Sequence, residues 1–226
     1  MRENSLLTLE SQLVNFREIR IGKIAPGTLY RSCHPITWDD DIRTFAKLAH
    51  EARIATVINM NDTRKDLEKN LPQAPWYNKL YKTGSVWTGD LTFNFRSPEY
   101  RYGLQRILRF MIEHEAPYLI HCFAGIDRTG FLSALLEALM GGTFDEIADD
   151  YVQSFYFNTS ALYEIDIRKN PGGQAENVIL ELFGIMNGGT NVDKTRLDSI
   201  AEQYLLEMVG LTAEEVAALK TRLNIQ

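Results

Sequence analysis

A cysteine and an arginine stand six residues apart in the segment HCFAGIDRTG, residues 121–130. Cys122 follows a histidine, and Arg128 precedes a Thr-Gly pair. A thiolate is a strong nucleophile, and the planar guanidinium of arginine can bind two oxygens of one phosphate group. The residue types and their spacing therefore predict a site at which Cys122 attacks a phosphoryl group that Arg128 holds.

The elements on either side of this segment would position it. PYLIHC (117–122) is short and apolar and predicts a buried strand, and residues 129–140 predict a buried helix that Gly141 and Gly142 end. A loop that leads from a strand into a helix aims backbone N–H groups at one point, and the helix dipole adds partial positive charge there. We expect this cradle to favour the anionic form of Cys122, with Gly125 leaving room for a ligand.

Further strands and helices are indicated along the rest of the chain. The expected elements in the first half are a helix from Thr37 with a Thr37–Asp40 capping box, a strand at 55–60, a loop at 61–75 that can include a helical turn, a strand at 76–83, and a helix capped by Ser97 and ended by Pro117. Further helices are expected near 144–157, 175–186, 195–208 and 212–223, the last opening on a Thr212–Glu215 capping box. Strands that alternate with helices predict an α/β fold. We expect one domain over residues 1–226, with a central, mainly parallel sheet of four or five strands, flanking helices and a helical C-terminal part.

Composition limits the possible partners and location. The net charge of −6 argues against nucleic acid as a partner, and no apolar run is long enough to span a membrane. Two cysteines are too few for a disulfide framework, and the start of the chain lacks the pattern of a secretory signal. These features predict a cytoplasmic protein. An anionic substrate must then be attracted by a local positive site.

The segment HCFAGIDRTG resembles the His-Cys-x5-Arg-Thr/Ser signature of the cysteine-dependent protein tyrosine phosphatase superfamily. It is most similar to the bacterial tyrosine/dual-specificity phosphatases whose loop reads HCFAGKDRTG. LYRSCHP (29–35) and LTAEEVAALKTRLN (211–224) also resemble that subgroup. The resemblance implies a phosphatase fold and a cysteinyl-phosphate intermediate, formed without metal or cofactor. The implied substrate is a phosphorylated protein, with phosphotyrosine favoured over phosphoserine and phosphothreonine and dual specificity left open, or a small phosphoester.

The resemblance also implies roles for the residues of the loop. Cys122 would be the nucleophile and Arg128 the phosphate clamp, while His121 would support the loop through hydrogen bonds. Thr129 would bond the sulfur and ease its departure. The substrate would be bound mainly by backbone amides in the stretch Phe123, Ala124, Gly125, Ile126, Thr129 and Gly130.

Two carboxylates are candidates for the proton donor that the leaving oxygen requires. Asp90 is expected on a loop after a strand, where dual-specificity phosphatases tend to carry their general acid. Asp127 stands inside the cysteine segment, as in myotubularin-like lipid phosphatases. We favour Asp90, although Gly89-Asp90 would also suit a simple turn.

Two other functions remain open. A phosphoinositide or inositol-phosphate phosphatase would need more basic residues, which Arg31, Arg64 and Lys65 would supply. Ile126 argues against it, because the closest subgroup has lysine at this position. A phosphate-binding module without turnover is the second alternative, and the presence of both Cys122 and Arg128 argues against it.

Several residues near the predicted site have a simpler interpretation. Cys33 suits an ordinary half-buried thiol better than a redox partner of Cys122, and Arg31 suits a structural salt bridge as well as a ligand contact. The aromatic residues of 149–158 are typical of a helix core. Asp149 and Asp150 are expected on a solvated helix face.

Overall fold

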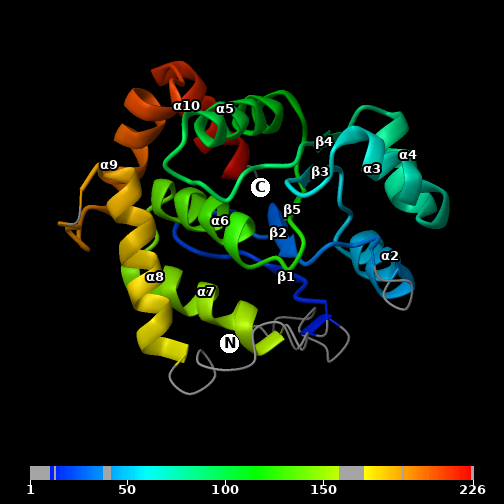
Figure 1. The fold of residues 1–226 in the computed structure, drawn as a ribbon, viewed down its shortest axis with the longest axis horizontal. Coiled ribbons are helices and arrows are strands. Elements are labelled where there is room, and N and C mark those ends of the chain that lie inside the picture. The colour runs from blue at the N-terminus through cyan, green and yellow to red at the C-terminus, as the bar shows by residue number, and fades with distance from the viewer. Residues whose placement is uncertain (1–10, 13, 38–41, 158–170, 190, 225–226) are drawn as a thin grey trace.

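The computed structural model describes residues 11–12, 14–37, 42–157, 171–189 and 191–224. Helices surround a central sheet (Figure 1). The strands are β1 Arg17–Glu18, β2 Leu29–Ser32, β3 Thr56–Asn59, β4 Val86–Thr88 and β5 Tyr118–His121. The helices are α2 Ile42–Glu51, α3 Arg64–Asn70, α4 Pro75–Lys82, α5 Pro98–Glu113, α6 Asp127–Leu139, α7 Phe144–Phe157, α8 Pro171–Met186, α9 Leu197–Gln203 and α10 Ala213–Leu223.

The sheet has the order β1-β2-β5-β3-β4, and only the β1–β2 pair is antiparallel. In the parallel core, His121 lies between Ser32 of β2 and Asn59 of β3. The segments that follow these three strands therefore leave the sheet side by side at one edge. This is the edge at which open parallel sheets bind their ligands, and Cys122 follows β5 there.

Each face of the sheet is covered by its own apolar core. On one face, Tyr118 and Ile120 of β5 pack with α5, α6 and the later helices. On the other face, Leu119 packs with α2, α3 and α4, which gather on the right of Figure 1. Because β5 is buried on both faces, its side chains are apolar almost throughout. The mainly parallel five-stranded α/β fold predicted from the sequence is confirmed.

The prediction of a strand at 76–83 was wrong. These residues form α4, which opens on Pro75 at a first-turn position, and the neighbouring strand is Val86–Thr88. Tyr77 is fully buried while Leu80 and Tyr81 pack partly against the same core, a spacing that suits a helix. The loop predicted at 61–75 also contains a helix, α3, capped by Thr63.

Other sequence predictions agree with the structure. Ser97 caps α5, and Thr212 with Glu215 forms a capping box at α10. The helix predicted at 195–208 is α9, which continues as a π-helix over Tyr204–Val209. The Thr37–Asp40 capping box lies partly outside the described residues. Among the described helices, none is long and apolar enough to cross a lipid bilayer.

Candidate active site

The loop from Cys122 to Arg128, named here the cysteine loop, connects β5 to α6. Its carbonyl groups are bonded to surrounding structure. The Phe123 carbonyl accepts from the His34 amide at 2.9 Å, and the Ile126 carbonyl accepts from the Gly130 amide at 2.7 Å. Since the first amides of a helix lack intrahelical acceptors, the start of α6 is a place where N–H groups can bind an anion.

Gly125 is the sharpest point of the loop. Its φ of +73° lies in the left-handed region, and an added Cβ would lie 2.6 Å from the Ser32 carbonyl carbon and 2.8 Å from the Cys33 amide nitrogen. The Gly125 carbonyl accepts from Arg31 Nη2 at 2.9 Å and from Asn15 Nδ2 at 3.3 Å. Glycine is therefore required here both by the backbone conformation and by the lack of space.

A buried charge cluster supports this point of the loop. Asp150 of α7 forms ion pairs with Arg31 of β2 and, at 2.8 Å, with Arg17 of β1. Burial would raise the pKa of Asp150, but the two guanidinium groups lower it to about 2. The prediction of a solvated Asp150 was wrong. Arg31 makes the structural salt bridge that was one of its two expected roles.

Glu137 of α6 completes this cluster. Burial, followed by the charge of Asp150, raises the pKa of Glu137 well above its usual value. Its Oε1 is buried without a hydrogen-bond partner among the described residues. The cluster therefore favours a neutral carboxyl at Glu137 beside an ionised Asp150.

Arg128 is almost fully buried at the start of α6 and is held by several acceptors. Its Nη1 donates to the carbonyls of Met60 at 2.8 Å and Leu91 at 3.1 Å, and its Nη2 donates to Asn61 Oδ1 at 2.9 Å. Its Nε is buried and has no partner among the described residues. The Nε–H and the second N–H of Nη2 remain for a ligand, and together they match two oxygens of a phosphate.

The segment after β4 adds an acid and an aromatic ring. Asp90 Oδ1 lies 3.2 Å from Arg128 Nη1, and its side chain is 62% exposed. The ring of Phe93, which is 60% exposed, has its centroid 4.2 Å from the guanidinium carbon of Arg128. Asp127, the other acid candidate, is half-buried in the first turn of α6. Sequence reasoning missed Phe93, because only the fold brings it to Arg128.

His121 is fully buried and connects the cysteine loop to α4 through a hydrogen bond. Burial, with the nearby His34, lowers the pKa of His121 well below its usual value, so the ring is neutral. Its Nδ1 lies 3.3 Å from the Cys122 carbonyl, which can only accept, so Nδ1 carries the hydrogen. Its Nε2 therefore accepts from the Tyr77 hydroxyl at 2.9 Å. Loop support by His121 is thus built from two hydrogen bonds.

Other predicted loop residues are placed less directly. The Ile126 side chain is packed in the core. Gly130 faces α7, where an added Cβ would lie 2.8 Å from Cδ2 of Tyr151. The Thr129 hydroxyl is buried without a hydrogen-bond partner among the described residues, so its bond to the Cys122 sulfur is not formed here. Cys33 and Cys122 are both buried, and they are not joined in a disulfide bond.

A polar group that sequence reasoning did not single out lies after β3. Asp62 accepts from His34 Nε2 at 2.8 Å and from the side chains of Asn59 and Asn61 at 3.0 and 2.9 Å. Burial would raise the pKa of Asp62, but the His34 hydrogen bond and the two amides lower it below its usual range. The only signal in the sequence was the polar run NMND at the end of an apolar strand.

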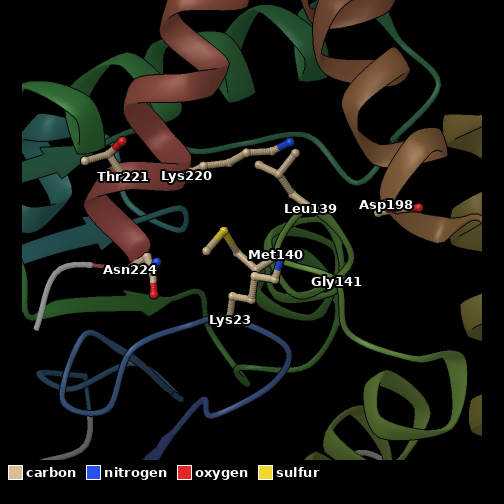
Figure 2. A pocket seen from close by; sticks show the side chains of 8 residues that line it. All are labelled: Lys23, Leu139, Met140, Gly141, Asp198, Lys220, Thr221 and Asn224. Carbon is tan, nitrogen blue, oxygen red and sulfur yellow. The ribbon is translucent and has the colours of Figure 1, made fainter.

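The surface pocket in Figure 2 is separate from the cysteine loop. It has a volume of roughly 410 Å³ and is lined by residues from the C-terminal end of α6 and from α10, including Met140 and Lys220. The cysteine loop joins the other end of α6, about 20 Å away at 1.5 Å per residue. This pocket therefore takes no part in the arrangement around Cys122.

Comparison with known proteins agrees with this arrangement. A tyrosine-protein phosphatase of Nostoc commune is 26% identical over 209 residues, which cover 83% of this chain and 64% of that protein. The triple specificity protein phosphatase PtpB of Mycobacterium tuberculosis is 42% identical over 67 residues, 28% of this chain and 24% of that protein. The chain thus spans less than two thirds of the length of either relative. The profile of the tyrosine phosphatase family matches residues 11–224, and the chain belongs to this family.

Proposed function

We propose that the protein hydrolyses phosphate monoesters, with phosphotyrosine in proteins as the preferred substrate. The observation that carries this proposal is the position of Cys122 at the end of β5, six residues before a buried Arg128 whose Nε has no partner among the described residues. The two relatives are named for phosphatase activity, and the second name includes three specificities. Both names support a phosphoester substrate.

The proposed reaction has two steps. The Cys122 thiolate attacks phosphorus, the bond from phosphorus to the ester oxygen breaks, and Asp90 gives its proton to that oxygen. Water then attacks phosphorus while the Asp90 carboxylate takes a proton, and the bond from sulfur to phosphorus breaks. Phosphate leaves and the thiolate is restored. In both steps Arg128 binds two of the phosphoryl oxygens, whose charge it stabilises.

Asp90 is the proposed general acid because its carboxylate already contacts the clamp. Asp90 Oδ1 lies 3.2 Å from Arg128 Nη1, so the acid and the guanidinium belong to the same site. Its exposure also lets it exchange protons with solvent between the two steps. Asp127 is the competing candidate, and its place in the first turn of α6 suits stabilisation of the helix dipole.

Phe93 supports an aromatic substrate. An exposed ring over the guanidinium forms an apolar wall next to the phosphate site, against which a tyrosyl ring can pack. The phosphoinositide alternative loses one of its expected basic residues, because Arg31 is buried in its ion pair with Asp150. Arg64 is exposed and pairs with Glu68 and Tyr81.

The nucleophile is tested by replacing Cys122 with serine. The parent protein should release phosphate from a phosphotyrosine peptide faster than from phosphoserine peptides or phosphoinositides, and Cys122→Ser should release none. Hydrolysis by Cys122→Ser at the parent rate would remove Cys122 from the mechanism. A parent protein that binds phosphate without turnover would instead favour the binding-module alternative.

The general acid is tested with esters whose leaving groups differ in basicity. Asp90→Asn should reduce kcat by about 10²–10⁴ for phenyl phosphate and much less for p-nitrophenyl phosphate, whose leaving group needs little protonation. Asp127→Asn should affect both substrates alike. The reverse pattern would assign the proton transfer to Asp127.

Three further features remain predictions. Catalysis without metal or cofactor is expected, because thiolate, guanidinium and carboxylate together supply every step above. A cytoplasmic location is supported by the two cysteines, which are not joined in a disulfide bond, since thiols persist in reducing compartments. A single phosphatase domain over residues 1–226 is supported by the family match over 11–224.

A further inference from the structure

The residues after β3 contact Arg128 without belonging to the cysteine loop. Asn61 Oδ1 accepts from Arg128 Nη2 at 2.9 Å, while Asn61 Nδ2 donates to Asp62 Oδ1 at 2.9 Å. The second oxygen of Asp62 accepts from His34 and Asn59. His34 and Asn59 are fully buried, and Asp62 is 7% exposed. A continuous set of hydrogen bonds thus runs from the core to the clamp.

The chemistry of these groups permits one orientation of the Asn61 amide. An ionised carboxylate only accepts hydrogen bonds, so the NH2 group of Asn61 must face Asp62. The amide oxygen then faces Arg128, whose guanidinium only donates. A flipped amide would place donor against donor at Arg128 and acceptor against acceptor at Asp62. Asp62 therefore sets the direction in which Asn61 receives Arg128.

Asn61 also determines which edge of the guanidinium is left for substrate. The carbonyls of Met60 and Leu91 and the carboxylate of Asp90 accept from Nη1, and Asn61 accepts one hydrogen of Nη2. These four acceptors define the plane of the guanidinium, and its Nε has no partner among the described residues. Asn61 is uncharged, so it orients the cation without neutralising the charge that attracts phosphate. An acidic residue at this position would compete with the ligand.

We propose that Asn61 is a positioning residue for Arg128 and that Asp62 acts through Asn61. This inference rests on the proposed function, since Arg128 must be the group that binds phosphate. It requires that the effect of Asp62 on phosphate binding passes through the Asn61 amide.

The test uses Asn61→Leu, Asp62→Asn and the double variant. Three quantities are measured: kcat and KM for p-nitrophenyl phosphate, the inhibition constant of inorganic phosphate, and the rate of Cys122 alkylation by iodoacetate. Asn61→Leu should raise the inhibition constant of phosphate and lower kcat/KM at least tenfold, because the clamp loses its orientation. Alkylation should change less than twofold, because the lost hydrogen bond is to the Arg128 side chain and not to the backbone that surrounds Cys122. Asn70→Leu, at the end of α3, is the matched control, since the Asn70 side chain makes no capping bond.

Coupling between the two positions separates positioning from general damage. The inhibition constant of phosphate for the double variant should be no worse than for Asn61→Leu alone, because the hydrogen bonds from the Asp62 side chain reach the Arg128 guanidinium through the Asn61 amide. Additive losses, or an inhibition constant within twofold of the parent for Asn61→Leu, would overturn the proposal. If Asp62→Asn does not fold, the inhibition constant of phosphate for Asn61→Leu alone decides whether the proposal holds. An active Cys122→Ser protein would instead overturn the proposed function itself.

Discussion

Replacing Gly125 with alanine should inactivate the protein while leaving it folded. The left-handed conformation of this residue costs an L-amino acid roughly 1–2 kcal/mol. The added Cβ meets backbone atoms of Ser32 and Cys33 in β2 and the segment after it, which cannot move aside as a flexible side chain would. The loop must shift, and the bonds from Arg31 and Asn15 to the Gly125 carbonyl are lost, each worth about 1 kcal/mol.

These contributions amount to roughly 4 kcal/mol against the observed loop conformation, or about a thousandfold in its population. We therefore expect kcat/KM for p-nitrophenyl phosphate to fall about a thousandfold. Gly84→Ala is the matched control, because Gly84 has a φ of +79° but no atom within 4 Å of an added Cβ. Full activity of Gly125→Ala, with cooperative thermal unfolding, would refute the reasoning that the Gly125 conformation forms the cradle.

Three other predictions concern the buried charges and the aromatic wall. Because the folded-state pKa of Asp150 is about 2, below its usual 3.8, this residue stabilises the fold above pH 4, and its contribution is lost as the pH falls from about 4 to about 2. Asp150→Asn should make the free energy of unfolding in urea less dependent on pH over that range. It should also lower that free energy by about 3–5 kcal/mol at pH 7, since two buried guanidinium groups lose their carboxylate partner. A pH dependence equal to that of the parent would contradict this. Glu137→Gln should raise the melting temperature relative to the parent, and the difference should grow as the pH rises above about 4.5. The reason is that the raised pKa of Glu137 lets the unfolded chain lose this proton at a lower pH than the folded protein, which destabilises the folded parent. Phe93→Ala should raise KM for a phosphotyrosine peptide several-fold more than for a phosphoserine peptide, and equal changes would exclude a stacking role.

The position of the cysteine loop between a strand and a helix was predictable because its signal is local. The residues of HCFAGIDRTG are consecutive, and a strand before them and a helix after them follow from apolar pattern and glycine placement. The same holds for capping by Ser97 and Thr212, which depends on neighbours three residues away. In each case the interacting groups are close in the sequence.

The missed features depend on contacts between distant segments. Asp150 looked like a surface acid within an acidic stretch, and only packing of α7 against β1 and β2 buries it between Arg17 and Arg31. Phe93 and Asn61 reach Arg128 from loops after different strands. The strand predicted at 76–83 failed for a related reason, because apolar and aromatic residues suit either element until the position of Pro75 is weighed.

The guanidinium of Arg31 connects the cysteine loop to α7. It binds the Gly125 carbonyl on one side and the Asp150 carboxylate of α7 on the other. A displacement of α7 should therefore shift the backbone around Gly125, three residues after Cys122. A laboratory selection for altered turnover should accordingly recover substitutions in the layer formed by α7 and α8, far from any group that touches the ester.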